Sequence, residues 1–227
     1  MVDVLKVMDW SPLFISVKTA ALATVIAFFI GLYAASQVMK AKPKTKAILD
    51  GILTLPMVLP PTVMGYMLLL FFSLKRPIGS FLYDNYNIKI VQTWAGCVIA
   101  AVVVSFPLMY RSARGAFEQV EVNIIHAAQT LGMSNRKIFW KVMLPCARPG
   151  IVSGTILTFA RALGEYGATS MLAGNIIGKT STISQVIAMV MKDGDYLKAG
   201  IWVIIIMIFA FFIVAVMNMV SEKKNVI

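Results

Sequence analysis

The chain has 227 residues, of which 59% are apolar and only 14% charged, and its mean hydropathy is +0.81. A soluble domain usually carries about 25% charged residues, so this composition excludes a soluble enzyme and a disordered tail. With only two cysteines, the chain is not a disulfide scaffold. Its net charge of +11 is spread in short basic clusters between apolar runs, which is typical of a membrane protein rather than of a nucleic-acid-binding protein.

Five apolar stretches are long enough to cross a bilayer, which takes about 20 helical residues. They are 12–39, 48–74, 90–110, 150–173 and 199–220. The longest remaining stretch, 111–149, is too short to hide a nucleotide-hydrolysing domain. The sequence therefore predicts an all-α polytopic membrane protein with five transmembrane helices, built as a single transmembrane domain over 1–227.

The basic residues between these stretches set the expected orientation. Segment 40–46 holds four lysines, segment 111–149 holds six basic residues, and Lys223 and Lys224 follow the last stretch. The loops on the other side hold fewer basic residues and most of the aspartates. Because cytoplasmic loops are enriched in Lys and Arg, we expect the N-terminus outside, the C-terminus inside, and the loop 115–149 in the cytoplasm.

Three prolines interrupt the second stretch. Pro56, Pro60 and Pro61 each remove a backbone hydrogen bond, and Thr62 follows them directly. A helix broken at membrane depth is tolerated only against protein or a water-filled cavity. These four residues are therefore candidates for lining a translocation path, with a kinked packing helix as the alternative.

The fourth stretch carries two charges at i and i+4. Arg161 and Glu165 share one helical face and can pair. Charges at this depth usually face a bundle interior or a cavity, so the pair either lines or gates a path for a charged solute or orients neighbouring helices. Gly150 and Gly154 form a GxxxG pattern that permits close helix packing.

The loop 115–149 has the pattern of two short amphipathic helices. Apolar residues spaced by three and four predict one helix over 116–131, ended by Gly132. Ser134 can begin a second helix, which Leu144–Pro145 should end. Such a pair would dock into a groove on a cytoplasmic partner or lie flat on the lipid headgroups.

Part of this loop resembles the coupling motif of ABC-importer permeases. His126, Ala127, Ala128 and Gly132, followed by Leu144 and Pro145, match a motif that reads Glu-Ala-Ala, three residues, Gly, and then Leu-Pro. In that family the motif docks into the ATP-hydrolysing subunit. His126 stands where the family has glutamate, so an ion pair made by that glutamate is not expected here.

The segments 55–69 and 159–180 extend the resemblance to the permeases for tetrahedral oxyanions, with molybdate permeases the best match and sulfate permeases near neighbours. The resemblance implies a type I ABC-importer permease fold in a prokaryotic plasma membrane. It also implies a homodimer, two cytoplasmic ABC ATPase subunits that bind ATP and magnesium, and an external oxyanion-binding protein. The permease itself would then have no catalytic residue, cofactor or metal site.

The function expected from these features is import of an oxyanion, most directly molybdate, by alternating access driven by the separate ATPase. A sulfate or tungstate permease of the same architecture is the first alternative. An ATP-independent channel or ion-coupled carrier is a second, and would leave the coupling motif unexplained. An intramembrane enzyme would need a nucleophile–base pair at depth, whereas the single histidine lies in the loop.

Overall fold

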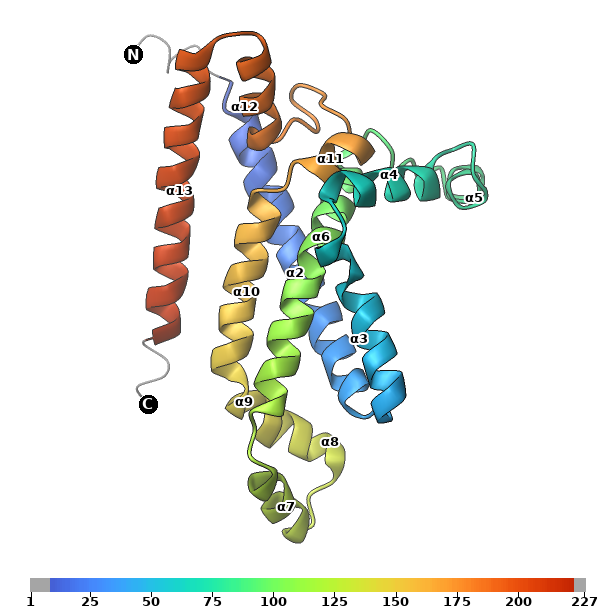
Figure 1. Ribbon diagram of the computed structural model, residues 1–227, viewed down its shortest axis with the longest axis vertical. Coiled ribbons are helices and arrows are strands. Elements are labelled where there is room, and N and C mark those ends of the chain that lie inside the picture. The colour runs from blue at the N-terminus through green and yellow to red at the C-terminus, as the bar shows by residue number, and fades with distance from the viewer. Residues whose placement is uncertain (1–8, 223–227) are drawn as a thin grey trace.

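A computed structural model describes residues 9–222, and the regular elements of that part of the chain are all helical (Figure 1). In chain order they are α2 (Ser11–Met39), α3 (Pro43–Val58), α4 (Pro61–Phe72), α5 (Pro77–Tyr86), α6 (Trp94–Glu118), α7 (Val122–Thr130), α8 (Asn135–Ile138), the π-helical turn η1 (Phe139–Met143), α9 (Leu144–Cys146), α10 (Arg148–Leu163), α11 (Gly167–Leu172), α12 (Ile183–Lys192) and α13 (Tyr196–Glu222).

The long helices alternate in direction, as Figure 1 shows. Within the described residues, α2, α6 and α13 are each long and apolar enough to cross a membrane unbroken. Two bent pairs, Pro43–Val58 with Pro61–Phe72 and Asn135–Cys146 with Arg148–Leu163, raise the number to five if each pair counts as one span. The segments 40–46 and 111–149 lie at the same end of the bundle, as the distribution of basic residues requires.

Small residues let α2, α6 and α10 pack closely at the centre of the bundle. Ala20 and Ala23 of α2 are buried with Ala101 of α6 and Ala162 of α10. A Cβ placed on Gly150 would lie 2.7 Å from the Cβ of Ala116. The close helix packing predicted from the GxxxG pattern is therefore confirmed, because only a glycine permits this approach of α10 to α6.

The third span and the loop after it divide differently from the prediction. Thr93 caps α6 by accepting a hydrogen bond from the Gly96 amide, and the helix continues to Glu118, well beyond 110. The prediction of a single helix over 116–131 is wrong, because α6 ends at Glu118 and α7 begins at Val122. The apolar positions of this stretch belong to two elements, because Phe117 and Val120 are buried in the bundle core while α7 begins only at Val122.

Leu144–Pro145 does not end the second loop helix, which is a further correction. The Leu144 amide donates to the Phe139 carbonyl five residues back, so the chain widens into a π-helical turn and remains helical through Cys146. The proline ring normally clashes with the carbonyl four residues earlier, and the wider turn accommodates it. The bend of 69° into α10 follows at Ala147.

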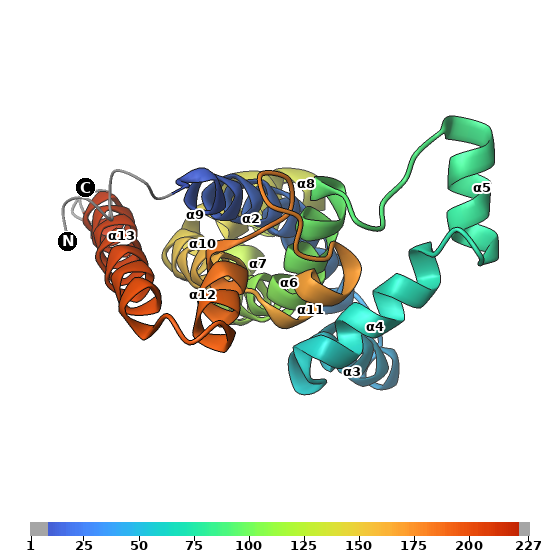
Figure 2. The ribbon, with the colours of Figure 1, turned by 90° about the horizontal axis from the view of Figure 1, so that it is seen from above.

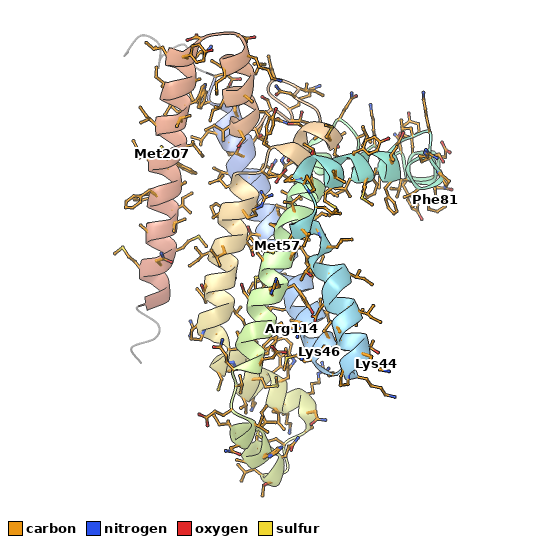
Figure 3. The ribbon with its side chains drawn as sticks, in the orientation of Figure 1. Lys44, Lys46, Met57, Phe81, Arg114 and Met207 are labelled. Carbon is orange, nitrogen blue, oxygen red and sulfur yellow. The ribbon has the colours of Figure 1, made fainter. Side chains whose placement is uncertain are left out.

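Two parts of the chain project from the central bundle. Helix α4 packs on the bundle near its start, and with α5 it forms an arm that Figure 2 shows extending away from the other helices. Phe81 lies near its end and is 57% exposed (Figure 3). Helix α13 lies on the opposite flank with an apolar outer face that includes Met207.

Candidate coupling helices and translocation elbow

The helices α7 and α8 form the end of the molecule farthest from α12 (Figure 1). Gly132 has a φ of +75°, its amide bonds the Gln129 carbonyl, and the Met133 amide bonds the Ala128 carbonyl. This hydrogen-bond pair is a Schellman motif, which requires the left-handed conformation that glycine adopts without strain. The role predicted for Gly132 as the end of a helix is confirmed, although that helix is α7 rather than 116–131.

The sequence motif of the loop does not form one continuous surface. His126 and Ala127 are exposed on α7, and Leu131 is 82% exposed beside them, whereas Ala128 is buried against the neighbouring helices. Leu144 and Pro145 lie nearer the bundle, where they line a cavity with α2. The tip that a partner can contact is therefore α7 and the turn after it.

The second span breaks where the three prolines lie. Pro56 lies inside α3, Leu59 and Pro60 have extended ψ angles, and Pro61 and Thr62 begin α4. The two halves meet at 106°. The predicted break is confirmed, and we call the residues from Pro56 to Thr62 the elbow.

The elbow lies against a second interruption, between α10 and α11. A Cβ on Gly167 would lie 3.0 Å from the Cβ of Pro61 and 3.2 Å from the Thr62 nitrogen. A Cβ on Gly65 would lie 2.6 Å from the Cα of Ala168. The second and fourth spans therefore cross at backbone contact, and the stretch predicted as 150–173 is two helices rather than one.

Arg161 and Glu165 pair across this interruption, as their spacing predicts. An Arg161 guanidinium nitrogen lies 2.8 Å from Glu165 Oε2, and the Ala168 amide donates to Glu165 Oε1 at 2.7 Å. The Glu165 side chain is 2% exposed and that of Arg161 33%. Glu165 therefore has both oxygens engaged in holding α11 to α10, while about a third of the Arg161 side chain remains exposed.

A charged cluster at the basic end of the bundle was not anticipated from the sequence. Asp50 of α3 accepts hydrogen bonds from Tyr110 and Arg114 of α6. Glu118 accepts from Arg114 Nε at 3.2 Å and from Lys46 Nζ at 2.6 Å. Figure 3 labels Arg114 and Lys46 at neighbouring ends of α6 and α3. We call these five residues the inner clamp; its sequence signal was Asp50, the single acid in 48–74.

The comparison with known families decides which protein family has this geometry. Residues 27–222 match the family described as binding-protein-dependent transport system inner membrane component. The chain belongs to this family. It is thus a permease subunit of an ABC transporter and an integral, multi-pass protein of the bacterial plasma membrane.

Individual members of the family agree with this assignment. The chain is 43% identical to the molybdenum transport system permease protein ModB of Escherichia coli (strain K12) over 77% of this chain and 76% of that protein. It is 37% identical to the putative molybdenum permease YvgM of Bacillus subtilis (strain 168) over 95% and 94%. It is 33% identical to the sulfate permease CysT of Salmonella typhimurium over 82% and 67%.

Solved structures support the fold alone, because their sequence identity is low. A chain of the MetNI methionine ABC transporter in an inward-facing conformation superimposes with a TM-score of 0.75 at 15% identity, over 93% of this chain and 94% of that one. A chain of a bacterial ABC transporter that imports alginate gives 0.79 at 14%, over 94% and 78%. The type I ABC-importer permease fold expected from the sequence is confirmed.

Proposed function

We propose that this chain is the membrane-spanning subunit of an ATP-driven importer for a tetrahedral oxyanion, most directly molybdate. The observation that carries the coupling part of the proposal is the α7 tip, an exposed helix end that projects from the basic end of the bundle. The oxyanion rests on the likeness to permeases named for molybdenum and for sulfate. Sulfate or tungstate transport with the same architecture is the alternative.

The α7 tip supplies an apolar docking surface for a cytoplasmic ABC ATPase subunit. Val122 is 60% exposed, Ile124 42% and Leu131 82%, and burying such residues in a partner's groove is favourable. His126 lies beside them, exposed on α7, in the position where the family has glutamate. ATP and magnesium would be bound by the ATPase subunits, and this chain would contribute positioning rather than chemistry.

A second copy of the chain would cover the projecting arm. Exposed apolar residues follow one another along α4 and α5, among them Tyr66, Met67, Phe71 and Phe81. An exposed apolar patch suits a protein or membrane interface, and we assign this one to a second copy because the arm projects away from the chain's own bundle. In the proposed homodimer the arms and the elbows face the two-fold axis, and the loops at the outer end, with α12, receive an external oxyanion-binding protein.

Arg161 is the residue that this arrangement offers to an anion on its path. Its side chain emerges on the face of α10 that the bundle leaves exposed, which also carries Ser153, Leu157 and Gly164. Because Glu165 neutralises part of its charge, Arg161 would attract an oxyanion without retaining it. Pro56, Pro60, Pro61 and Thr62 would line the same passage from the elbow, and movement of the tip would open it to alternate sides.

The experiment that tests this function is ATP hydrolysis in liposomes containing this chain, its candidate ATPase and the binding protein loaded in turn with molybdate, tungstate or sulfate. Stimulation by loaded molybdate supports the proposal, and stimulation only by another anion replaces molybdate with that anion. Leu131→Asp should abolish the stimulation. Met219→Asp, at a 61% exposed methionine near the inner end of α13 and away from both the tip and the outer loops, is the matched control.

Two outcomes would contradict the proposal. If the ATPase binds stably but no loaded anion stimulates hydrolysis, the chain does not serve an oxyanion importer. If no ATPase binds and anions cross the membrane without ATP, the chain is a channel or an ion-coupled carrier.

A further inference from the structure

The basic end of the bundle contains two adjoining cavities that share part of their lining. The first, about 700 Å³, lies between α2 and the segment from η1 to α10, and its apolar lining includes Phe28, Phe29, Leu32, Leu144, Ile151 and Val152. The second, about 710 Å³, lies between α2 and the loop helices. Tyr33, Ser36, Phe139 and Trp140 line both. Each has the size of a ligand site.

The charges along this double cavity have one sign. Lys40 and Arg136 line the second cavity and Arg148 lines the first, while neither lining contains an aspartate or a glutamate. Within residues 9–222 the cations found in ion pairs are Lys46, Arg114 and Arg161. The cavity cations Lys40, Arg136 and Arg148 are therefore available to an occupant. An occupant should therefore carry negative charge near Lys40 and Arg136.

The cavity also changes character along its length. Its bundle side is almost wholly aliphatic and aromatic, whereas its loop side adds the polar Gln37, Asn135 and the two cations. Tyr33 is 67% exposed and Trp140 59% exposed where the two cavities join. Amphipathic aromatic side chains occupy this position at the boundary between hydrocarbon and headgroups. The occupant should thus have an apolar chain attached to an anionic head.

We infer that this double cavity binds an anionic phospholipid of the cytoplasmic leaflet. One acyl chain lies among Phe28, Phe29, Leu32 and Val152, and the phosphate lies between Lys40 and Arg136. Basic pockets between helices on this side of a membrane suit such headgroups, because the leaflet carries a negative surface potential. The site rests on the orientation in the proposed function, with loop 111–149 in the cytoplasm, but not on the transported anion.

Because the lipid contacts both α2 and η1, it joins the bundle to the base of the coupling helices. A lipid held there would restrain the loop that carries the α7 tip. Removal of the lipid should therefore weaken the response of ATP hydrolysis to the loaded binding protein while leaving assembly with the ATPase intact.

Native mass spectrometry of the detergent-solubilised complex tests the site directly. Phosphatidylglycerol and phosphatidylcholine with identical acyl chains are titrated into the complex of this chain with its ATPase. We expect one phosphatidylglycerol to be retained per copy of this chain, and phosphatidylcholine to bind markedly more weakly. Lys40→Gln and Arg136→Gln should each weaken the binding of phosphatidylglycerol by about fivefold, since a basic residue near the membrane surface contributes about 1 kcal/mol to that binding. Lys42→Gln and Lys44→Gln remove exposed charges at the same end and should have no such effect.

A second variant tests the apolar part without changing charge. Ser36→Trp fills the junction of the cavities and should displace the lipid, whereas Ile30→Trp, on α2 outside both linings, should not. Equal retention of the two lipids, insensitivity to both charge variants, or retention in Ser36→Trp would overturn the site. So would a lack of any retained lipid in the wild-type complex. Because lipid retention is read on the assembled complex, these outcomes are distinct from a failure of anion-stimulated hydrolysis.

Discussion

The two halves of the broken second span are held to the bundle by opposite means. The inner half, α3, is attached to α6 by the inner clamp, in which Asp50, Arg114, Glu118 and Lys46 form ion pairs. The outer half, α4, crosses α11 at Gly65 and Gly167 with almost no space between the backbones. One attachment is polar and partly exposed, and the other is apolar and closely packed.

This difference indicates how the span can move. Ion pairs near water can exchange partners at small free-energy differences, whereas a packed crossing tolerates few alternative geometries. A change at the coupling helices would therefore reach α3 through the end of α6 that carries the clamp, and the elbow would take up the motion while α4 stays fixed on α11. The following substitutions separate the two attachments, beginning with the largest expected effect.

Gly65→Leu should disrupt the outer crossing. A Cβ alone would lie 2.6 Å from the Cα and 2.9 Å from the carbonyl oxygen of Ala168, and a backbone cannot give way as a flexible side chain does. Overpacking of this kind destabilises by about 3 kcal/mol. The control is Gly51→Leu in α3, where a Cβ meets nothing within 4 Å. Thermal unfolding in detergent should show a much lower midpoint for Gly65→Leu and an unchanged midpoint for Gly51→Leu. Equal midpoints would mean that the crossing is not packed as described.

Arg114→Gln should open the inner clamp. Arg114 is the residue that bridges both carboxylates, so its loss leaves Asp50 with only the Tyr110 hydroxyl as partner. Leaving a partly buried carboxylate without its charged partner lowers the free energy of unfolding by about 2 kcal/mol. Arg111→Gln, one turn earlier and exposed, is the matched control. Arg114→Lys should recover only part of the loss, since an ammonium cannot span two carboxylates as a guanidinium does.

Much of the architecture could be predicted because it depends on local physical rules. The apolar lengths predicted the spans, the prolines predicted the elbow, and the i, i+4 spacing predicted the pair of Arg161 and Glu165. Each of these follows from residues close together in the chain.

The sequence could not predict contacts between distant segments. The clamp joins residues such as Lys46 and Glu118, 72 positions apart, and no periodicity encodes that pairing. The helix boundary at 119–121 was missed because Phe117 and Val120 pack on the bundle while the following apolar residues form the tip. The spacing of three and four between apolar residues continued from α6 into α7, although the first packs on the bundle and the second forms the exposed tip. The interruption at 164–166 carried only a glycine as its signal.

Tyr110→Phe should weaken the clamp without breaking it. The Tyr110 side chain is fully buried, and its hydroxyl donates to Asp50, which keeps Arg114 as its charged partner. Loss of one such hydrogen bond costs about 1 kcal/mol, so the unfolding midpoint should fall by less than in Arg114→Gln. Tyr196→Phe, at a 72% exposed tyrosine outside the clamp and both cavities, provides the comparison. A loss equal to that of Arg114→Gln would show that the hydroxyl, rather than the ion pair, positions Asp50.

Lys46→Gln should have the smallest effect, and salt should remove it. The side chains of Lys46 and Glu118 are 29% and 42% exposed, compared with 23% and 22% for Arg114 and Asp50. An exposed pair contributes about 0–1 kcal/mol, and at about 1 M salt the Debye length falls to about 3 Å. Unfolding at low and high salt should therefore distinguish Lys46→Gln from wild type only at low salt, with Lys44→Gln unchanged in both. The loss in Arg114→Gln should persist at high salt, because that pair is the more enclosed. If salt abolished both losses equally, the clamp would be a surface feature throughout, too weak to pass motion from α6 to α3.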